Sequence, residues 1–185
     1  DNDILLMKSN RYGDMEWQQS FGGSQMDIAS HIEQASDGGF IISATTESYG
    51  QGGKDIWLFK TSSSGLIEWN KYIGTPYDDY SGQVLETDDG GFILIGSRGS
   101  SDQNDNDIWL IKTNSQGDSS WTRSYGGNQF DRGNDILADD QGGFILLGST
   151  ESQGNGGKDI WLLKVDENGN DQWNNTYGNG SDDIG

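Results

Sequence analysis

The 185-residue chain has no cysteine and a single proline, Pro76. The lack of cysteine excludes disulfide bonds and thiolate metal sites, although it does not fix the cellular compartment. Basic residues are also scarce, with 11 against 30 acidic residues, which gives a net charge of −19. A chain of this charge repels phosphate backbones and anionic membrane surfaces, so we expect no nucleic-acid partner. No run of about 18 apolar residues is present, so we also expect no membrane insertion.

Glycine and aromatic residues, in contrast, are abundant. The 29 glycines predict many tight turns, and seven Trp, seven Tyr and six Phe supply large side chains for a core. No window places apolar residues at helical spacing, which favours an all-β fold.

One unit of 52 residues is repeated along the chain. The segment DIWLLK at 159–164 recurs as DIWLIK at 107–112, DIWLFK at 55–60 and DILLMK at 3–8. The copies follow one another without an insertion or deletion, so each is one structural unit. The repeat starts are Asp3, Asp55, Asp107 and Asp159; the same period is kept by Trp17, Trp69, Trp121 and Trp173, by Gly13, Gly65, Gly117 and Gly169, and by Asp27, Asp79, Asp131 and Asp183.

Each period divides into four short segments with the composition of β-strands, at about 132–137, 142–149, 159–164 and 173–178 in the last full copy. The two middle segments are apolar on both faces, so they need sheets packed on both sides. The last segment alternates with polar residues, which is typical of an outer, partly exposed strand. Four antiparallel strands per unit, stacked between neighbouring units, predict a β-propeller blade. A β-solenoid is the alternative, although its coils are usually shorter than this period.

The motifs also resemble a known family. GGFILxGS/T, then DIWLxK, then N/S-x-x-G-x-x-x-W and Y-G-G-x-x-x-D resemble the β-propeller repeat of secreted bacterial and archaeal proteins. The hairpin-plus-Trp layout is similar to kelch and quinoprotein-type blades. The resemblance covers the whole chain and implies an extracellular or cell-surface location. The roles it implies are adhesion, scaffolding and, in some members, catalysis.

The number of blades is smaller than a closed ring needs. Residues 1–185 form a single β-propeller region of about three and a half blades, whereas propellers close with about four to eight. The chain also opens on Asp1 rather than Met. We therefore expect a trimmed product or a piece of a longer chain, with self-assembly through open blade edges as the alternative.

Two oxygen-rich segments are candidates for calcium. In VDENGNDQW, at 165–173, only the glycine persists in the sister copies, which indicates a structural turn. In DQNDND, at 102–107, polar oxygens replace the glycines and the lysine of GQGGKD and GNGGKD. Asp102, Asn104 and Asp105 are therefore candidate calcium ligands, and no other cofactor is expected. The aspartates repeated at Asp27, Asp79, Asp131 and Asp183 are expected to accept backbone N–H bonds in the loops between blades.

The connections between repeats differ most among the copies, with SQM at 24–26, PYD at 76–78 and NQF at 128–130. With the residues that follow, they give a varied aromatic and charged set suited to contact with a protein or carbohydrate ligand: Tyr77, Asp78, Tyr80, Phe130 and Arg132. His31 is the one histidine, so the usual nucleophile–base and zinc arrangements are missing.

The sequence favours a non-catalytic interaction or structural module that binds protein or glycan. Two alternatives stay open. One is a carbohydrate-active enzyme domain with paired carboxylates at the mouth of the propeller, and the other is a subunit of a surface fibre or layer.

Overall fold

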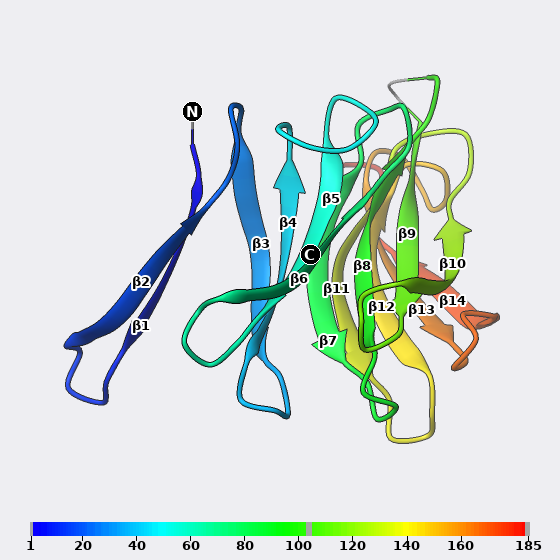
Figure 1. Ribbon diagram of the computed structural model, residues 1–185. Helices are drawn as coiled ribbons and strands as arrows, with labels where there is room; N and C mark the ends of the chain where they lie inside the picture. The colour runs from blue at the N-terminus through cyan, green and yellow to red at the C-terminus, as the bar shows by residue number, and fades with distance from the viewer. Residues whose placement is uncertain (1, 103–104, 184–185) are drawn as a thin grey trace.

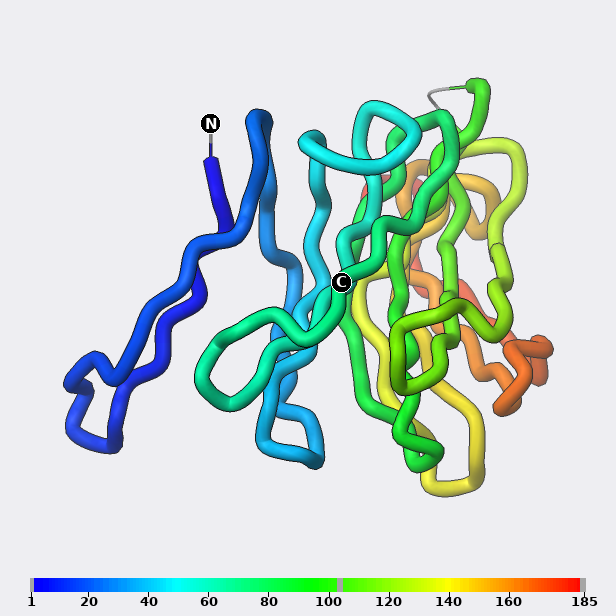
Figure 2. Tube along the Cα trace, in the orientation of Figure 1, coloured from blue at the N-terminus to red at the C-terminus, as the bar shows by residue number. Residues whose placement is uncertain are grey.

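The computed structural model describes residues 2–102 and 105–183, and every regular element within these ranges is a β-strand (Figures 1 and 2). The strands are β1 (Ile4–Ser9) and β2 (Met15–Phe21); β3 (Asp27–Gln34), β4 (Phe40–Thr46), β5 (Asp55–Thr61) and β6 (Ile67–Ile73); β7 (Tyr80–Glu86), β8 (Phe92–Gly99), β9 (Asn106–Thr113) and β10 (Ser119–Tyr125); and β11 (Asp131–Ala138), β12 (Phe144–Thr150), β13 (Asp159–Val165) and β14 (Asp171–Tyr177). None of the described residues forms a helix long and apolar enough to cross a membrane.

The strands pair in chain order into one two-stranded and three four-stranded antiparallel sheets. We number these sheets first to fourth, from β1–β2 to β11–β14. The expected order within a unit is confirmed, because the GGF strand and the DIWLxK strand form the middle pair and the Trp strand lies at one edge. From left to right, Figure 1 shows the first sheet, the second sheet, and then the third and fourth sheets together, which is consistent with a propeller-like arrangement.

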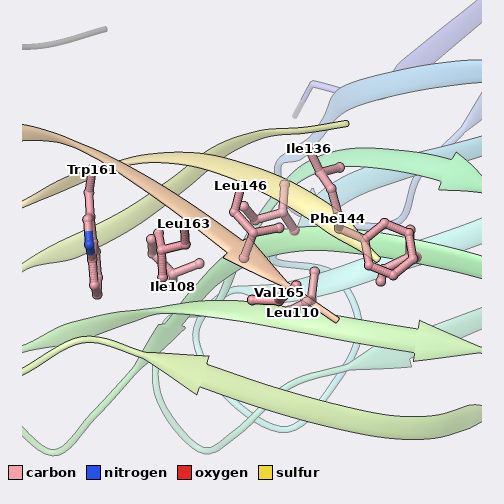
Figure 3. Close-up of a cluster of buried hydrophobic side chains, with 10 residues drawn as sticks. Ile108, Leu110, Ile136, Phe144, Leu146, Trp161, Leu163 and Val165 are labelled. Carbon is pink, nitrogen blue, oxygen red and sulfur yellow. The ribbon is translucent and has the colours of Figure 1, made fainter. Parts of the chain in front are cut away.

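The core lies between the sheets, because each middle strand has two apolar faces. On β9, Ile108 and Leu110 pack against the fourth sheet, whereas Trp109 and Ile111 pack against the second. Figure 3 shows Ile108 and Leu110 among side chains of the fourth sheet, including Leu146. The alternation with period two therefore produces a separate apolar layer at each sheet interface.

One face of the fourth sheet departs from this rule. Ile160 and Leu162 of β13 are half-buried, although the equivalent Ile108 and Leu110 of β9 are fully buried. No other sheet among the described residues covers this face. The prediction that both faces are buried in every unit is therefore wrong for the fourth sheet, since burial depends on a neighbouring unit and not on the strand's own sequence.

The repeated tryptophan and the repeated turn glycine belong to one contact between units. Trp69 of β6 lies 5.7 Å, between ring centroids, from Phe92 in the next sheet. Gly117 has a φ of +77°, and a Cβ there would lie 2.5 Å from the Trp69 ring. Glycine is thus required both by the turn and by the close approach of the ring. The contact recurs at Trp17 with Gly65 and at Trp121 with Gly169, and Trp173, which no further unit covers, is 42% exposed.

The lysine of DIWLxK is buried and paired with an acidic turn. Lys112 Nζ lies 2.8 Å from a carboxylate oxygen of Asp89, and it also donates a hydrogen bond to the carbonyl oxygen of Thr113. The same pairing joins Lys60 to Asp37 in the second sheet. In the fourth sheet Gln141 stands at the position of Asp89, and Asp139 binds Lys164 instead.

The oxygen-rich segment at 165–173 is a turn. Oδ1 of Asp166 accepts hydrogen bonds from the backbone N–H groups of Asn168 and Asn170, both at 2.8 Å. Gly169 has a φ of +74°. The interpretation of this segment as a structural turn is confirmed, because its carboxylate oxygen already binds the protein's own backbone.

Candidate functional site

A pocket of about 530 Å³ lies where the loops of the third sheet meet the fourth. Its walls include all five residues of the expected ligand-contact set, Tyr77, Asp78, Tyr80, Phe130 and Arg132. The first three come from the β6–β7 connection and the start of β7, and the last two from the start of β11 and the residue before it. These connections lie at the upper end of the molecule in Figure 1. The tertiary structure thus brings together two segments that are about 50 residues apart in the chain.

A network with Lys54 fixes one wall of the pocket. The hydroxyl of Tyr80 lies 3.4 Å from Nζ of Lys54 and 3.4 Å from Oδ2 of Asp78. Nζ of Lys54 also lies 5.1 Å from the centre of the Tyr80 ring. Burial lowers the pKa of Lys54, but the Tyr80 hydroxyl, Asp78 and Glu47 together raise it above its usual value, so the amine stays charged. Tyr80 is therefore held in a fixed orientation.

Two further aromatic side chains are available to a ligand. Tyr77 is 43% exposed beside the Lys54 network. Phe130 is half-buried on the opposite wall, with Nζ of Lys158 5.2 Å from its ring centre. The pocket thus has aromatic surface on two sides, contributed by different sheets.

Sequence reasoning missed two polar residues of this pocket, Ser97 and Asn106. Ser97, at the end of β8, is 1% exposed, and its Oγ has no hydrogen-bond partner among the described residues. Asn106 opens β9 and is 5% exposed, and none of the described residues is bonded to its carboxamide. Buried polar groups normally have partners, so these two are suited to hydrogen bonds with a ligand. At the position of Asn106 the neighbouring copies have Lys54 and Lys158, but the first copy has Asn2, so this residue alone does not single out the third unit. Ser97 could not have been found from the sequence either, because it aligns with Thr45 and Ser149.

Two positions of the repeat that join the loops in the second and fourth units carry other residues where the pocket forms. In the second and fourth units the lysine backbone N–H closes the loops by donating to an aspartate, from Lys54 to Asp78 at 3.2 Å and from Lys158 to Asp182 at 3.0 Å. The first unit has Asn2 and Met26 at these positions. In the third unit Asn106 and Phe130 occupy the two positions. The contact that joins the loops is therefore replaced by a carboxamide and an aromatic ring that line a cavity.

Two of the candidate calcium ligands, Asp102 and Asp105, contact Ser100, which lines this pocket. Asn104 lies outside the described residues. Asp102 and Asp105 belong to a turn in which the backbone N–H of Asp105 donates to the carbonyl of Asp102, and Ser100 Oγ lies 3.3 Å from Oδ2 of Asp105. Among the described residues, no group of three or more His, Asp or Glu side chains is arranged to hold a metal ion. Calcium binding by this loop stays a prediction.

The aspartates repeated at Asp27, Asp79, Asp131 and Asp183 hold the loops that connect successive units. Oδ2 of Asp79 accepts hydrogen bonds from the backbone N–H and the hydroxyl of Thr75, and Oδ1 accepts from the N–H of Gly99. Asp27 and Asp131 are the first residues of β3 and β11 rather than loop residues, but their carboxylates reach back to the same loop. The equivalent acceptors bind the N–H groups of Gly23 at Asp27, Gly127 at Asp131 and Asn179 at Asp183.

The aspartate at the start of each repeat lies close to the aspartate that holds the connecting loop, with a glycine between them. Oδ1 of Asp55 and Oδ2 of Asp79 both lie against the Cα of Gly74, so two buried carboxylates share a small space. Burial raises the pKa of Asp79 and the charge of Asp55 raises it further, against the hydrogen bonds from Thr75 and Gly99. Asp107 behaves alike, since burial and the charges of Asp105 and Asp131 raise its pKa.

These pKa shifts predict a stability maximum in mildly acidic solution. A raised folded-state pKa means that ionised Asp79 and Asp107 destabilise the fold, so their protonation as the pH falls through the raised pKa values should raise the melting temperature. Lys112 and Lys60, by donating hydrogen bonds, hold the pKa values of Asp89 and Asp37 below 3.8. The stabilisation that these two lysine–aspartate pairs provide is complete above pH 3.8. It is lost as the pH falls through the lowered pKa values of Asp89 and Asp37.

Thermal melts at about pH 7, 5 and 3 check this prediction. We expect the highest midpoint at the intermediate pH and a smaller rise from pH 7 to 5 in Asp79→Asn. A midpoint that falls steadily from pH 7 would contradict it.

No family model and no curated protein matches the chain. Among solved structures, a protein of unknown function from Bacteroides caccae is similar, with a TM-score of 0.39 and 10% sequence identity over 95% of this chain and 78% of that chain. A similarity of this size says nothing about function, so the pocket has to be interpreted from its own chemistry.

Proposed function

We propose that the chain is part of a β-propeller at the cell surface or in the extracellular space, and that it binds a saccharide without catalysis. Three four-stranded antiparallel sheets and a two-stranded one, stacked through apolar layers, support the propeller. The location rests on the resemblance of the repeat to secreted propeller proteins.

The observation that carries the binding function is the pocket between the third and fourth sheets. Its volume of about 530 Å³ lies within the range of small-molecule sites. It combines aromatic surface from Tyr77, Tyr80 and Phe130 with the carboxamide of Asn106 and with the Ser97 hydroxyl, which has no hydrogen-bond partner among the described residues. Sugars present both C–H faces and hydroxyl groups, and this combination of walls is complementary to both.

The composition of the pocket favours binding over hydrolysis. Glycoside hydrolysis generally needs two carboxyl groups about 5–10 Å apart on either side of the bond to be cleaved. Asp78 is the one carboxylate among the described lining residues, and it already accepts a hydrogen bond from the backbone N–H of Lys54.

Replacement of Tyr77 by Ala tests this proposal. An array of neutral and acidic oligosaccharides first identifies the saccharide that the wild-type chain binds. We expect Tyr77→Ala to weaken binding of that saccharide by about tenfold, which is 1.4 kcal/mol. Isothermal titration measures the affinity. Tyr177→Ala is the matched control, because Tyr177 is 53% exposed on β14 and Tyr77 is 43% exposed. Absence of saccharide binding across the array, or equal losses in the two variants, would refute the function.

A second candidate is assembly of copies through uncovered sheet faces. On β1, Leu5 is 62% and Met7 58% exposed, at the positions where the second sheet buries Trp57 and Phe59. At the other end of the stack, Ile160 and Leu162 are half-buried. These two faces are equivalent to the two sheet surfaces that pack against each other at each internal interface, so a face of one copy can pack on the other face of a second copy. A monomer in sedimentation velocity at every concentration tested would rule out this candidate.

A further inference from the structure

Arg132 stands apart from the other basic side chains. Its guanidinium makes no ion pair, hydrogen bond or ring contact with any described residue, and the side chain is exposed at the start of β11. Each of the other lysines and arginines has at least one such contact: Lys8, Arg11, Lys54, Lys60, Lys71, Arg98, Lys112, Arg123, Lys158 and Lys164. None of the four arginines has an ion pair with a described residue, but Arg11, Arg98 and Arg123 each lie over an aromatic ring, and Arg132 does not.

The position of Arg132 places this free cation at the centre of the site. Besides the pocket of about 530 Å³, Arg132 lines a cavity of about 220 Å³ that it shares with Tyr80 and Lys54. It also lines a third cavity, of about 540 Å³, between the inner strands β3, β7 and β11. In the two preceding copies the equivalent residues are Ile28 and Tyr80, so the cation occurs at this position in one unit.

The surrounding groups indicate which anion this arginine would bind. A planar guanidinium binds a carboxylate through two parallel N–H···O bonds. The overall negative field of the protein opposes ligands with several charges, such as phosphates or sulfated chains, more strongly than a single carboxylate. Ser97 and Asn106 can bond hydroxyl groups beside it, and Tyr80 and Phe130 offer ring faces.

We propose that the pocket selects an acidic saccharide, with the carboxylate of a uronic acid bound by Arg132. The sugar ring lies against the aromatic walls, and its hydroxyl groups reach Ser97 Oγ and the Asn106 carboxamide. This inference rests on the saccharide-binding function proposed above and adds the charge of the ligand to it.

The test compares a charged sugar with its uncharged ester on the same chain. Galacturonate, which carries one carboxylate, and its methyl ester are titrated into wild-type protein, Arg132→Gln and Arg123→Gln. Arg123 is an exposed arginine outside the pocket, so its variant changes the net charge equally. We expect the acid to bind wild type at least tenfold more tightly than the ester. Arg132→Gln should weaken binding of the acid and abolish this difference, whereas Arg123→Gln should behave as wild type.

Each other result overturns the inference in a distinguishable way. Equal binding of acid and ester that still depends on Tyr77 would refute charge selection and leave the saccharide function intact. A preference for the acid that persists in Arg132→Gln would refute the assignment to Arg132. Absence of binding by either sugar refutes uronic-acid recognition, and the array then decides whether neutral saccharides bind. Because Arg132 is exposed and unpartnered, its variant should melt as wild type does.

Discussion

Leu110→Ala is expected to lower the free energy of unfolding by about 2–5 kcal/mol, the usual cost of emptying a fully buried leucine site. Leu110 is 0% exposed at the interface between the third and fourth sheets, where it belongs to the layer with Leu146 and Trp161. The sheets on both sides are held by their hydrogen-bonded registers, so they cannot close over the cavity without disturbing neighbouring contacts.

The chain carries its own control for this substitution. Leu162 occupies the same position of the repeat, in the same strand context, but lies on the half-buried face of the fourth sheet. Leu162→Ala should cost roughly 1 kcal/mol or less, because little apolar surface is withdrawn from water there. Urea unfolding measures both values. Equal losses for the two variants would mean that the outer face of the fourth sheet is covered in solution.

Gly74→Ala is expected to destabilise the fold by about 1–3 kcal/mol through overpacking. The φ of Gly74 is not in the left-handed region, so backbone strain is not the reason. A Cβ would instead overlap Oδ1 of Asp55, a side chain only 1% exposed. Asp55 cannot move away freely, because its other oxygen accepts hydrogen bonds from the N–H groups of Gln51 and Gly52.

Gly180→Ala is the matched control for this variant. Gly180 also lies outside the left-handed region, and a Cβ there would meet no atom within 4 Å. The melting temperature of Gly180→Ala should be unchanged or slightly raised, because alanine reduces the conformational freedom of the unfolded chain. Thermal melts compare the two variants. A Gly74→Ala protein as stable as wild type would show that the paired aspartates are not packed against the glycine.

The functional interpretation depends on comparing units within one chain. Features shared by all units serve the architecture: the tryptophan packs on the next unit's turn, and the aspartates bind loop N–H groups. Two departures from the repeat, Phe130 and Arg132, line a single pocket together with Asn106. An internal repeat thus supplies its own reference, against which the altered residues can be recognised.

Much of the fold followed from local patterns. The alternation in DIWLIK and GGFILI predicted strands with two apolar faces, and the third sheet buries both, with Ile108 on one side and Trp109 on the other. Strand boundaries were close, and the pairing order within a sheet was as expected. Such features depend on residues near one another in the chain, and the fixed period repeats the same local signal four times.

The candidate site was predictable only in part. The five variable residues were identified because they differ among copies, and the structure places all of them in one cavity. Ser97 carried no signal, because a small hydroxyl residue stands at that position in every full copy. Its importance comes from being buried beside a cavity without a partner, which no sequence pattern reports.

The sequence by itself determined the unit: four strands, the turn glycines, the buried layers and the repeated aspartates, because hydrogen-bonded strands and tight turns follow from nearby residues. Only the tertiary structure decided which loops of successive units meet. It also decided that Arg132 lies in the pocket without an ion pair or ring contact, and that one face of the fourth sheet is uncovered, within the part of the chain that the structure describes. Those properties arise from contacts between residues far apart in the chain, whose geometry depends on how whole sheets pack against one another.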